Sequence, residues 1–217
     1  NLQDATGLTV TATAVPGLLG VLITDAASDS PISVSNNNVA AQATINSATN
    51  SLSLTGATGL SASAALVNSQ ATSGGDAASS ATATVSFGVI GATVANGVTG
   101  SPLNVSGNSF SASAAGNVAT NALNATATSV YGVTGTPTIG GAIAGGGYSS
   151  QADYTVLNSQ TNNAPISASA SLLAIGVLSG GPVTGSSMSV QNNAISASGV
   201  GNSASNSIML SQVAGSM

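Results

Sequence analysis

The chain contains few side chains that could take part in catalysis. Its charged side chains are five aspartates, and Lys, Arg, His and Cys are all missing. These aspartates are Asp4, Asp25, Asp29, Asp76 and Asp153. General bases and strong nucleophiles come mainly from the missing residue types, so hydrolysis by an aspartate pair is the main catalytic chemistry left open. Nothing in the spacing brings two of the five together, and we expect a protein that is not an enzyme and needs no cofactor.

Calcium binding is the other chemistry that the aspartates suggest. The segment SGGDA at Ser73–Ala77 is similar to calcium-binding turns, and Asp25 and Asp29 share one expected loop. Calcium takes about six to eight oxygen ligands, usually from several carboxylates. Single aspartates in turns more often cap the local backbone. We therefore expect these aspartates to be structural and predict no metal site.

The composition also limits the partners. Without Lys or Arg the chain has no side chain that neutralises phosphate, so neither nucleic acid nor an anionic membrane surface is an expected partner. The longest apolar run, Gly17–Ile23, is too short to span a membrane. The chain begins at Asn1 without a methionine, which we interpret as a processed, exported form.

The chain is nevertheless expected to fold. Hydrophobic residues make up 42% of it and its mean hydropathy is +0.40, whereas disordered chains combine low hydrophobicity with high charge. The apolar residues are mainly alanine and valine. Small side chains predict a thin core in which facing sheets lie close together.

Two sequence units recur along the chain, which we treat as a single repetitive domain, residues 1–217. The first unit carries asparagines and alanines at matching positions. The second is marked by LVNSQ at Leu66–Gln70 and VLNSQ at Val156–Gln160. The copies of the first unit lie near residues 30–54, 101–125 and 186–210, and those of the second near 59–91 and 148–178. Their unequal spacing indicates loops of different length between them.

Apolar and hydroxyl side chains alternate through most of the chain. In Leu8–Ala14, apolar side chains fall on one face and three threonines on the other. The same pattern places Phe87 and Val89 on the inward face with Ala81–Val85, and Leu172 with Ile166–Ala170. A period of two is typical of a strand with one buried face. The sequence therefore predicts half-buried strands with a Ser and Thr outer surface.

The alternation changes phase inside the first unit. Apolar residues occupy even positions from Phe110 to Ala114, but Asn117 to Leu123 use odd ones. If both sets face inward, the strand must slip at about Gly116, which indicates a corner or bulge. Buried asparagine is costly unless hydrogen-bonded, and identical amides stacked about 4.8 Å apart satisfy one another. The predicted ladders consist of Asn46, Asn117 and Asn202, and of Asn50, Asn121 and Asn206.

Repetition and stacking together predict the fold class. We expect an all-β protein, either a β-solenoid or a stacked β-arch with internal repeats and a thin core of Ala, Val and Asn. Each rung is expected to hold about 20 to 25 residues folded as strand, corner and strand.

The N-x-A-x-N core of the first unit resembles the repeats of curli-type functional amyloid subunits and of bacterial holdfast-anchoring fibre proteins. It occurs at Asn46–Asn50, Asn117–Asn121 and Asn202–Asn206, with Gln42 before the first copy. In curli-type repeats, Gln and Asn ladders flank the strand corners. The resemblance implies an exported subunit, expected to be bacterial, that polymerises into a cell-surface or biofilm-matrix fibre.

The expected function is that of an extracellular structural protein that assembles into a filament and serves adhesion. Solenoid ends expose unpaired backbone groups, which other proteins protect with charge, proline or a cap. This chain has no lysine for that purpose, so its ends favour heterologous addition of further copies. Its partners would be copies of itself and a secretion or anchoring protein. Joining by stacking and joining by insertion of a terminal strand both remain open.

Two other functions also remain open. A non-polymerising stalk of a secreted adhesin would be equally repetitive. Alternatively, the Thr and Ser ranks at Thr9–Thr13 and Thr82–Thr84 could bind ice or carbohydrate, although aromatic residues suited to sugars are few.

Overall fold

Every regular element in the described part of the chain is a β-strand. The computed structural model describes residues 1–57, 59–61, 64–73, 79–127, 130–131 and 154–212. The strands pair in parallel and stack as three successive rungs. The protein is thus an all-β solenoid of stacked arches, and the predicted fold class is confirmed.

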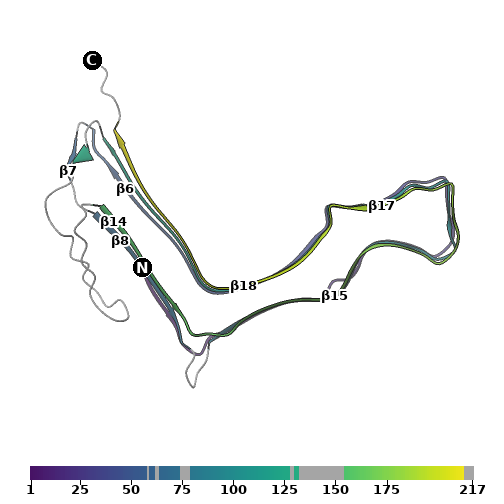
Figure 1. Ribbon diagram of the computed structural model, residues 1–217, viewed down its shortest axis with the longest axis horizontal. Coiled ribbons are helices and arrows are strands. Elements are labelled where there is room, and N and C mark those ends of the chain that lie inside the picture. The colour runs from purple at the N-terminus through teal and green to yellow at the C-terminus, as the bar shows by residue number, and fades with distance from the viewer. Residues whose placement is uncertain (58, 62–63, 74–78, 128–129, 132–153, 213–217) are drawn as a thin grey trace, which may run out of the picture.

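Each rung is a long, flattened loop of chain whose two layers face each other (Figure 1). The lower layer contains β1 (Leu2–Ala5), β2 (Thr9–Ala14) and β3 (Gly17–Ile23) in rung 1, β8 (Ala64–Thr72) and β9 (Ser80–Val94) in rung 2, and β14 (Tyr154–Asn162) and β15 (Ile166–Ser179) in rung 3. In the same order, the upper layer contains β5 (Ile32–Ser35) and β6 (Asn38–Thr55), β11 (Leu103–Ser106) and β12 (Ser109–Ala127), and β17 (Met188–Gln191) and β18 (Ala194–Gln212).

Short strands complete the rungs. One set of three joins the lower layer to the upper layer at the closed end of each rung, on the right in Figure 1. One pair lies at the opposite end, where the chain passes from one rung to the next. The first set is β4 (Ala27–Ser28), β10 (Val98–Thr99) and β16 (Val183–Thr184), and the pair is β7 (Leu60–Ser61) with β13 (Val130–Tyr131).

The parallel register aligns the repeat copies residue for residue. β12 pairs with β6 on one side and β18 on the other, at separations of 71 and 85 residues along the chain. The expectation of rungs of about 20 to 25 residues is therefore wrong. A copy of the first unit covers only one side of the interior, and the second unit supplies the facing layer. Pairing of β1 to β3 with β8 and β9 reveals a further copy of the second unit at residues 2–23.

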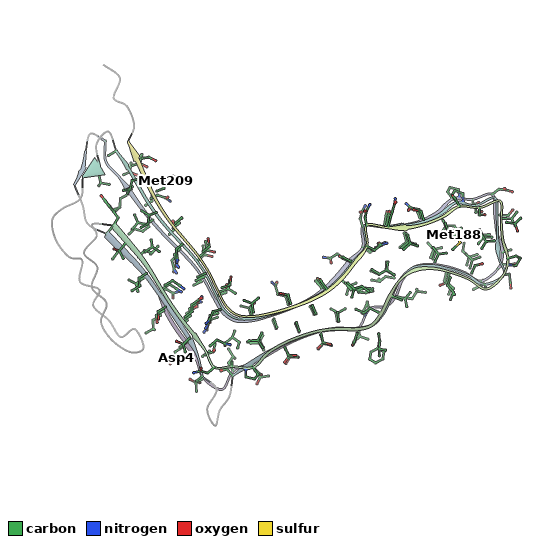
Figure 2. All side chains as sticks on the ribbon, in the orientation of Figure 1. Asp4, Met188 and Met209 are labelled. Carbon is green, nitrogen blue, oxygen red and sulfur yellow. The ribbon has the colours of Figure 1, made fainter. Side chains whose placement is uncertain are left out.

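The interior between the layers has an apolar part and a polar part (Figure 2). The apolar part lies toward the closed end and is made mostly of alanine and valine. Its largest member is Phe110, which is 0% exposed. The polar part lies between β8 and the second half of β12, where Asn68, Gln70, Asn117 and Asn121 are buried.

The predicted bulge in β12 is present. Buried positions change from even to odd numbers between Ala114 and Asn117, and the strand pairing leaves out Gly116. A Cβ at Gly116 would lie 2.5 Å from the carbonyl oxygen of Gly201 in rung 3. Glycine is needed here because the bulge brings two backbones into close approach.

A second phase change, in the lower layer, was not predicted. Phe87 and Leu172 have positive φ angles of 55° and 53° and are 62% and 68% exposed. A left-handed residue kinks the strand, and Ile90 and the alternate residues after it take the inward face instead. The predicted inward placement of Phe87, Val89 and Leu172 is therefore wrong, since Val89 is also exposed. In rung 1, Pro16 aligns with Phe87 and is followed by Gly17. This Pro–Gly pair is a turn signal, which the sequence analysis overlooked because the surrounding residues alternate regularly.

A column of glycines follows this kink. Gly20, Gly91 and Gly176 pair in register in rungs 1, 2 and 3. A Cβ at Gly20 would lie 1.8 Å from the Gly91 carbonyl oxygen, and one at Gly91 would lie 1.9 Å from that of Gly176. In the described structure no atom lies within 4 Å of a Cβ built on Gly176, because no rung follows it.

Two alanine substitutions in this column should differ sharply in their effect on the isolated subunit. Gly91→Ala forces rungs 2 and 3 apart and should lower the free energy of unfolding by about 1–3 kcal/mol, the usual cost of overpacking. Gly176→Ala is the matched control and should stay within about 0.5 kcal/mol of the wild type. Denaturant unfolding measures both, and equal stability of the two variants would contradict the stacking order.

Candidate functional site

The asparagines predicted to form ladders lie inside the solenoid, stacked from rung to rung. Nδ2 of Asn46 donates to Oδ1 of Asn117 at 2.8 Å, and Nδ2 of Asn117 donates to Oδ1 of Asn202 at 2.8 Å. The second ladder, with both bonds at 2.7 Å, joins Asn50, Asn121 and Asn206. Asn117 is 0% exposed. Because it both donates and accepts within the ladder, the cost of burying its amide is offset.

Two further ladders lie opposite these in the lower layer and were not predicted. Gln160 donates to Gln70 at 2.7 Å and Gln70 to Gln3 at 2.6 Å. The other, with bonds of 2.9 and 2.7 Å, joins Asn1, Asn68 and Asn158. The recurring LVNSQ and VLNSQ segments contain the asparagine and the glutamine of both ladders, so these two ladders could have been predicted from the repeat. The sequence analysis missed them because the rung 1 members, Asn1 and Gln3, lie at the start of the chain, where the sequence differs from LVNSQ and VLNSQ.

A fifth ladder stands at the start of the long upper strands. Asn37 donates to Oδ1 of Asn108 from its backbone nitrogen at 3.0 Å and from Nδ2 at 2.9 Å. Asn108 donates in the same way to Asn193 at 2.9 and 3.0 Å. Gln42, which contributed to the family resemblance, is exposed and pairs with Ser113, so it stands in no glutamine column.

Ladder side chains of each layer also donate hydrogen bonds across the interior to backbone carbonyls of the facing layer. Nδ2 of Asn117 in rung 2 donates to the carbonyl oxygen of Thr161 in rung 3 at 2.9 Å. Nε2 of Gln70 in rung 2 donates to the carbonyl of Val118 in the same rung at 3.0 Å. Asn46 makes the equivalent bond from rung 1 to the lower layer of rung 2 at 2.9 Å. The upper strands β6 and β12 therefore each lie between the lower strands of their own rung and of the next.

This half-rung stagger is also seen in how the strands pack. β6 of rung 1 packs on β2 and β9, and β12 of rung 2 packs on β9 and β15. β18 of rung 3 packs on β15, and the described chain offers it no lower strand of a following rung. The upper layer thus overhangs at the rung 3 end, and the lower layer overhangs at the rung 1 end.

The overhanging upper layer of rung 3 has large apolar side chains that the described chain leaves uncovered. Five of these inward-facing side chains are about half exposed, whereas their register partners in rung 2 are at most 1% exposed. They are Met188 at 47%, Val190 at 50%, Ile195 at 48%, Ile208 at 46% and Leu210 at 53%. At the other end, the inward residues of β2 are only partly buried, although their partners in β9 are 0% exposed. Both ends therefore expose apolar side chains that face inward in the fold.

The aspartates lie apart from these features. Asp25 and Asp29 accept hydrogen bonds from adjacent residues at 2.9 and 3.1 Å, and Asp4 lies on the outer side of β1 (Figure 2). Within the described ranges, no three His, Cys, Asp or Glu residues gather in one place. Asp76 and Asp153 lie outside those ranges.

The predicted threonine ranks lie on the outer face of the lower layer. Thr9, Thr11 and Thr13 of β2 are exposed, and Thr11 and Thr13 pair in register with Thr82 and Thr84 of β9. The result is a regular array of hydroxyl groups over two rungs.

No family model matches the chain, and no curated protein or solved structure is significantly similar to it. Among the described residues there is no helix with the length and hydropathy to cross a membrane. Functional inference therefore starts from the ladders and the two solenoid ends.

Replacing Asn117 and Asn121 together with alanine removes the central member of two ladders. Each buried polar partner left without a hydrogen bond costs about 1–3 kcal/mol, so the free energy of unfolding should fall by several kcal/mol, and assembly should be impaired. Thr120→Ala, at an exposed position between the two, is the control and should behave as wild type. Unchanged melting and assembly of the double variant would show that the ladders do not hold the rungs.

Proposed function

We propose that the protein is an extracellular structural subunit that polymerises end to end into a filament of the cell surface or biofilm matrix. The observation that carries this proposal is the exposure of the inward-facing side chains of rung 3, whose equivalents in rung 2 are buried. A second copy stacked on the rung 3 end would cover these side chains in the same way that rung 3 covers the equivalent side chains of rung 2.

The strand edges at the ends support the same proposal. β18 runs for 19 residues, Ala194–Gln212, and among the described strands it pairs with β12 alone. It contains no proline and no charged residue, the features that commonly keep edge strands from pairing with other chains. Burying a half-exposed aliphatic side chain contributes about 1 kcal/mol, and several would be buried at once. A long, uncharged, apolar edge of this kind favours addition of another copy.

The cell-surface or matrix location rests on the resemblance of the N-x-A-x-N core to curli-type and holdfast-anchoring fibre repeats. In that setting the filament would serve attachment, with backbone and amide ladders along its axis giving stiffness. Besides its own copies, a secretion or anchoring protein is the expected partner. A non-polymerising adhesin stalk would use the same solenoid and would differ by remaining monomeric.

The regular threonine array on β2 and β9 favours ice binding as a second candidate function. Its test is a thermal-hysteresis assay on the purified subunit, with Thr11→Lys as the disrupted variant. Hysteresis lost in the variant would support ice binding, and no hysteresis in the wild type would dismiss it.

The filament proposal predicts that charge on the inward face of rung 3 stops assembly. In a variant with Ile195→Lys and Ile208→Lys, two ammonium groups would have to be buried at the joint without partners, which is strongly unfavourable. Ser196→Lys places the same charge on the outward side of the same strand and serves as the matched control.

Electron microscopy and fibre diffraction of the tag-free proteins provide the measurement. Wild type and the Ser196→Lys control should form unbranched filaments with an axial repeat near 4.8 Å, and the double variant should form none. A persistently monomeric wild type, or a double variant that polymerises normally, would refute the proposal.

A further inference from the structure

We propose that subunits join in one polar sense, with the rung 3 end of one copy seated on the rung 1 end of the next, in the register that the rungs already use. This inference rests on the proposed filament function and specifies its joint. Four features of the structure differ between the two ends, and all four match only when unlike ends meet.

The first feature is the direction of the side-chain hydrogen bonds. In all four asparagine ladders Nδ2 of one rung donates to Oδ1 of the following rung. Rung 3 therefore presents amide donors and rung 1 presents amide oxygens. The glutamine ladder runs in the opposite sense, so Gln3 of the next copy would donate to Gln160. If two rung 3 ends met, the asparagine N–H donors of one copy would face those of the other. If two rung 1 ends met, asparagine oxygens would face oxygens.

The second feature is a substitute hydrogen bond at Asn202. Asn46 and Asn117 each donate across the interior to the lower layer of the following rung, both at 2.9 Å. The described residues include no rung after that of Asn202, and its Nδ2 donates at 3.3 Å to the carbonyl of Gln160 in its own rung. The strand register assigns the missing acceptor to the Asp4 carbonyl of the next copy.

The third feature is the stagger of the layers. β6 and β12 each pack between two lower strands, but β18 packs on β15 from one side. The uncovered side would receive β2 and β3 of the next copy, whose own inward residues are only partly buried. The overhang of the upper layer at one end thus fits the overhang of the lower layer at the other.

The fourth feature is the glycine column. Cβ positions at Gly20 and Gly91 point at the carbonyl oxygen of the following rung, at 1.8 and 1.9 Å. Gly176 continues this direction toward open space. In a polar joint it would face the Gly20 carbonyl of the next copy, so a methyl group at residue 176 would be harmless in the subunit and would block the joint.

The experiment compares two variants blocked at opposite ends. Gly176→Ala blocks the rung 3 end, and Ala12→Lys with Val21→Lys blocks the rung 1 end. Sedimentation velocity measures each alone and an equimolar mixture, with circular dichroism and melting as folding controls. We expect wild type to polymerise, each variant alone to stay monomeric, and the mixture to form a dimer and nothing larger.

The other outcomes separate the two proposals. If wild type forms filaments but each blocked variant dimerises alone through its open end, the polar joint is wrong and the filament function stands. If wild type stays monomeric, the filament function itself fails. Should the lysine variant not fold, Gly176→Ala alone decides: it should stay monomeric at concentrations at which wild type forms filaments, and its dimerisation through the open rung 1 end would overturn the inference.

Asn→Asp substitutions test the hydrogen-bond sense separately. Asn206→Asp keeps the oxygen that accepts from Asn121 at 2.7 Å, so the subunit should fold, but it cannot donate to Asn50 of the next copy. Filaments should be lost at neutral pH and recover near pH 3, below the usual aspartate pKa of about 3.9, with wild type as the control at both pH values. Asn50→Asp instead loses a donor inside the subunit and should destabilise it. If instead Asn206→Asp destabilised the subunit and Asn50→Asp blocked assembly of a stable subunit, the polar joint would be contradicted.

Discussion

The structure depends on the hydrogen bond between identical side-chain amides in successive rungs. A primary amide carries two N–H donors and an acceptor oxygen, so an asparagine in a parallel, in-register stack donates to one neighbour and accepts from the other, and its second N–H is free to donate to the facing layer. Asn117, at 0% exposure, accepts from Asn46 and donates to Asn202. A slip of one residue would move every inward side chain to the outer face and break all five ladders together. Register, parallel pairing and the repeat copies all follow from this interaction.

The same constraint accounts for the unusual composition. In a stacked solenoid each residue lies about 4.8 Å from its equivalent in the next rung, so a repeated charge would form a column of like charges. The chain has no Lys or Arg and only five acidic residues. Close approach of the backbones at Gly91 and Gly116 sets a second limit, since a Cβ at either would collide with the next rung. Small and uncharged residues are therefore what this geometry selects.

Much of this could be predicted from sequence because the repeat copies give the register directly. Aligning Asn46 with Asn117 and Asn202 fixes two ladders, and the parity change fixes the bulge at Gly116. The predicted rung length was wrong because alternation shows that a strand has a buried face but not which segment packs against that face. The facing layer of each rung comes from a segment distant in sequence. The inward placement of Phe87 and Leu172 was wrong because both left-handed residues are bulky apolar ones that continue the period of two, and the Pro16–Gly17 turn signal is present only in rung 1. The half-rung stagger, which distinguishes the two ends, arises only from packing between layers.

Side-chain hydrogen exchange tests the central claim, that buried amide ladders hold the rungs together, most directly. In an NMR measurement on the labelled subunit, the Nδ2 protons of Asn117 and Asn121 should exchange far more slowly than those of exposed Asn38, because both are buried in the central rung. Asn202 and Asn206 at the open end should exchange quickly in the subunit and become protected in filaments. Exchange at Asn117 and Asn121 as fast as at Asn38 would show that the ladders are open in solution and would contradict the account.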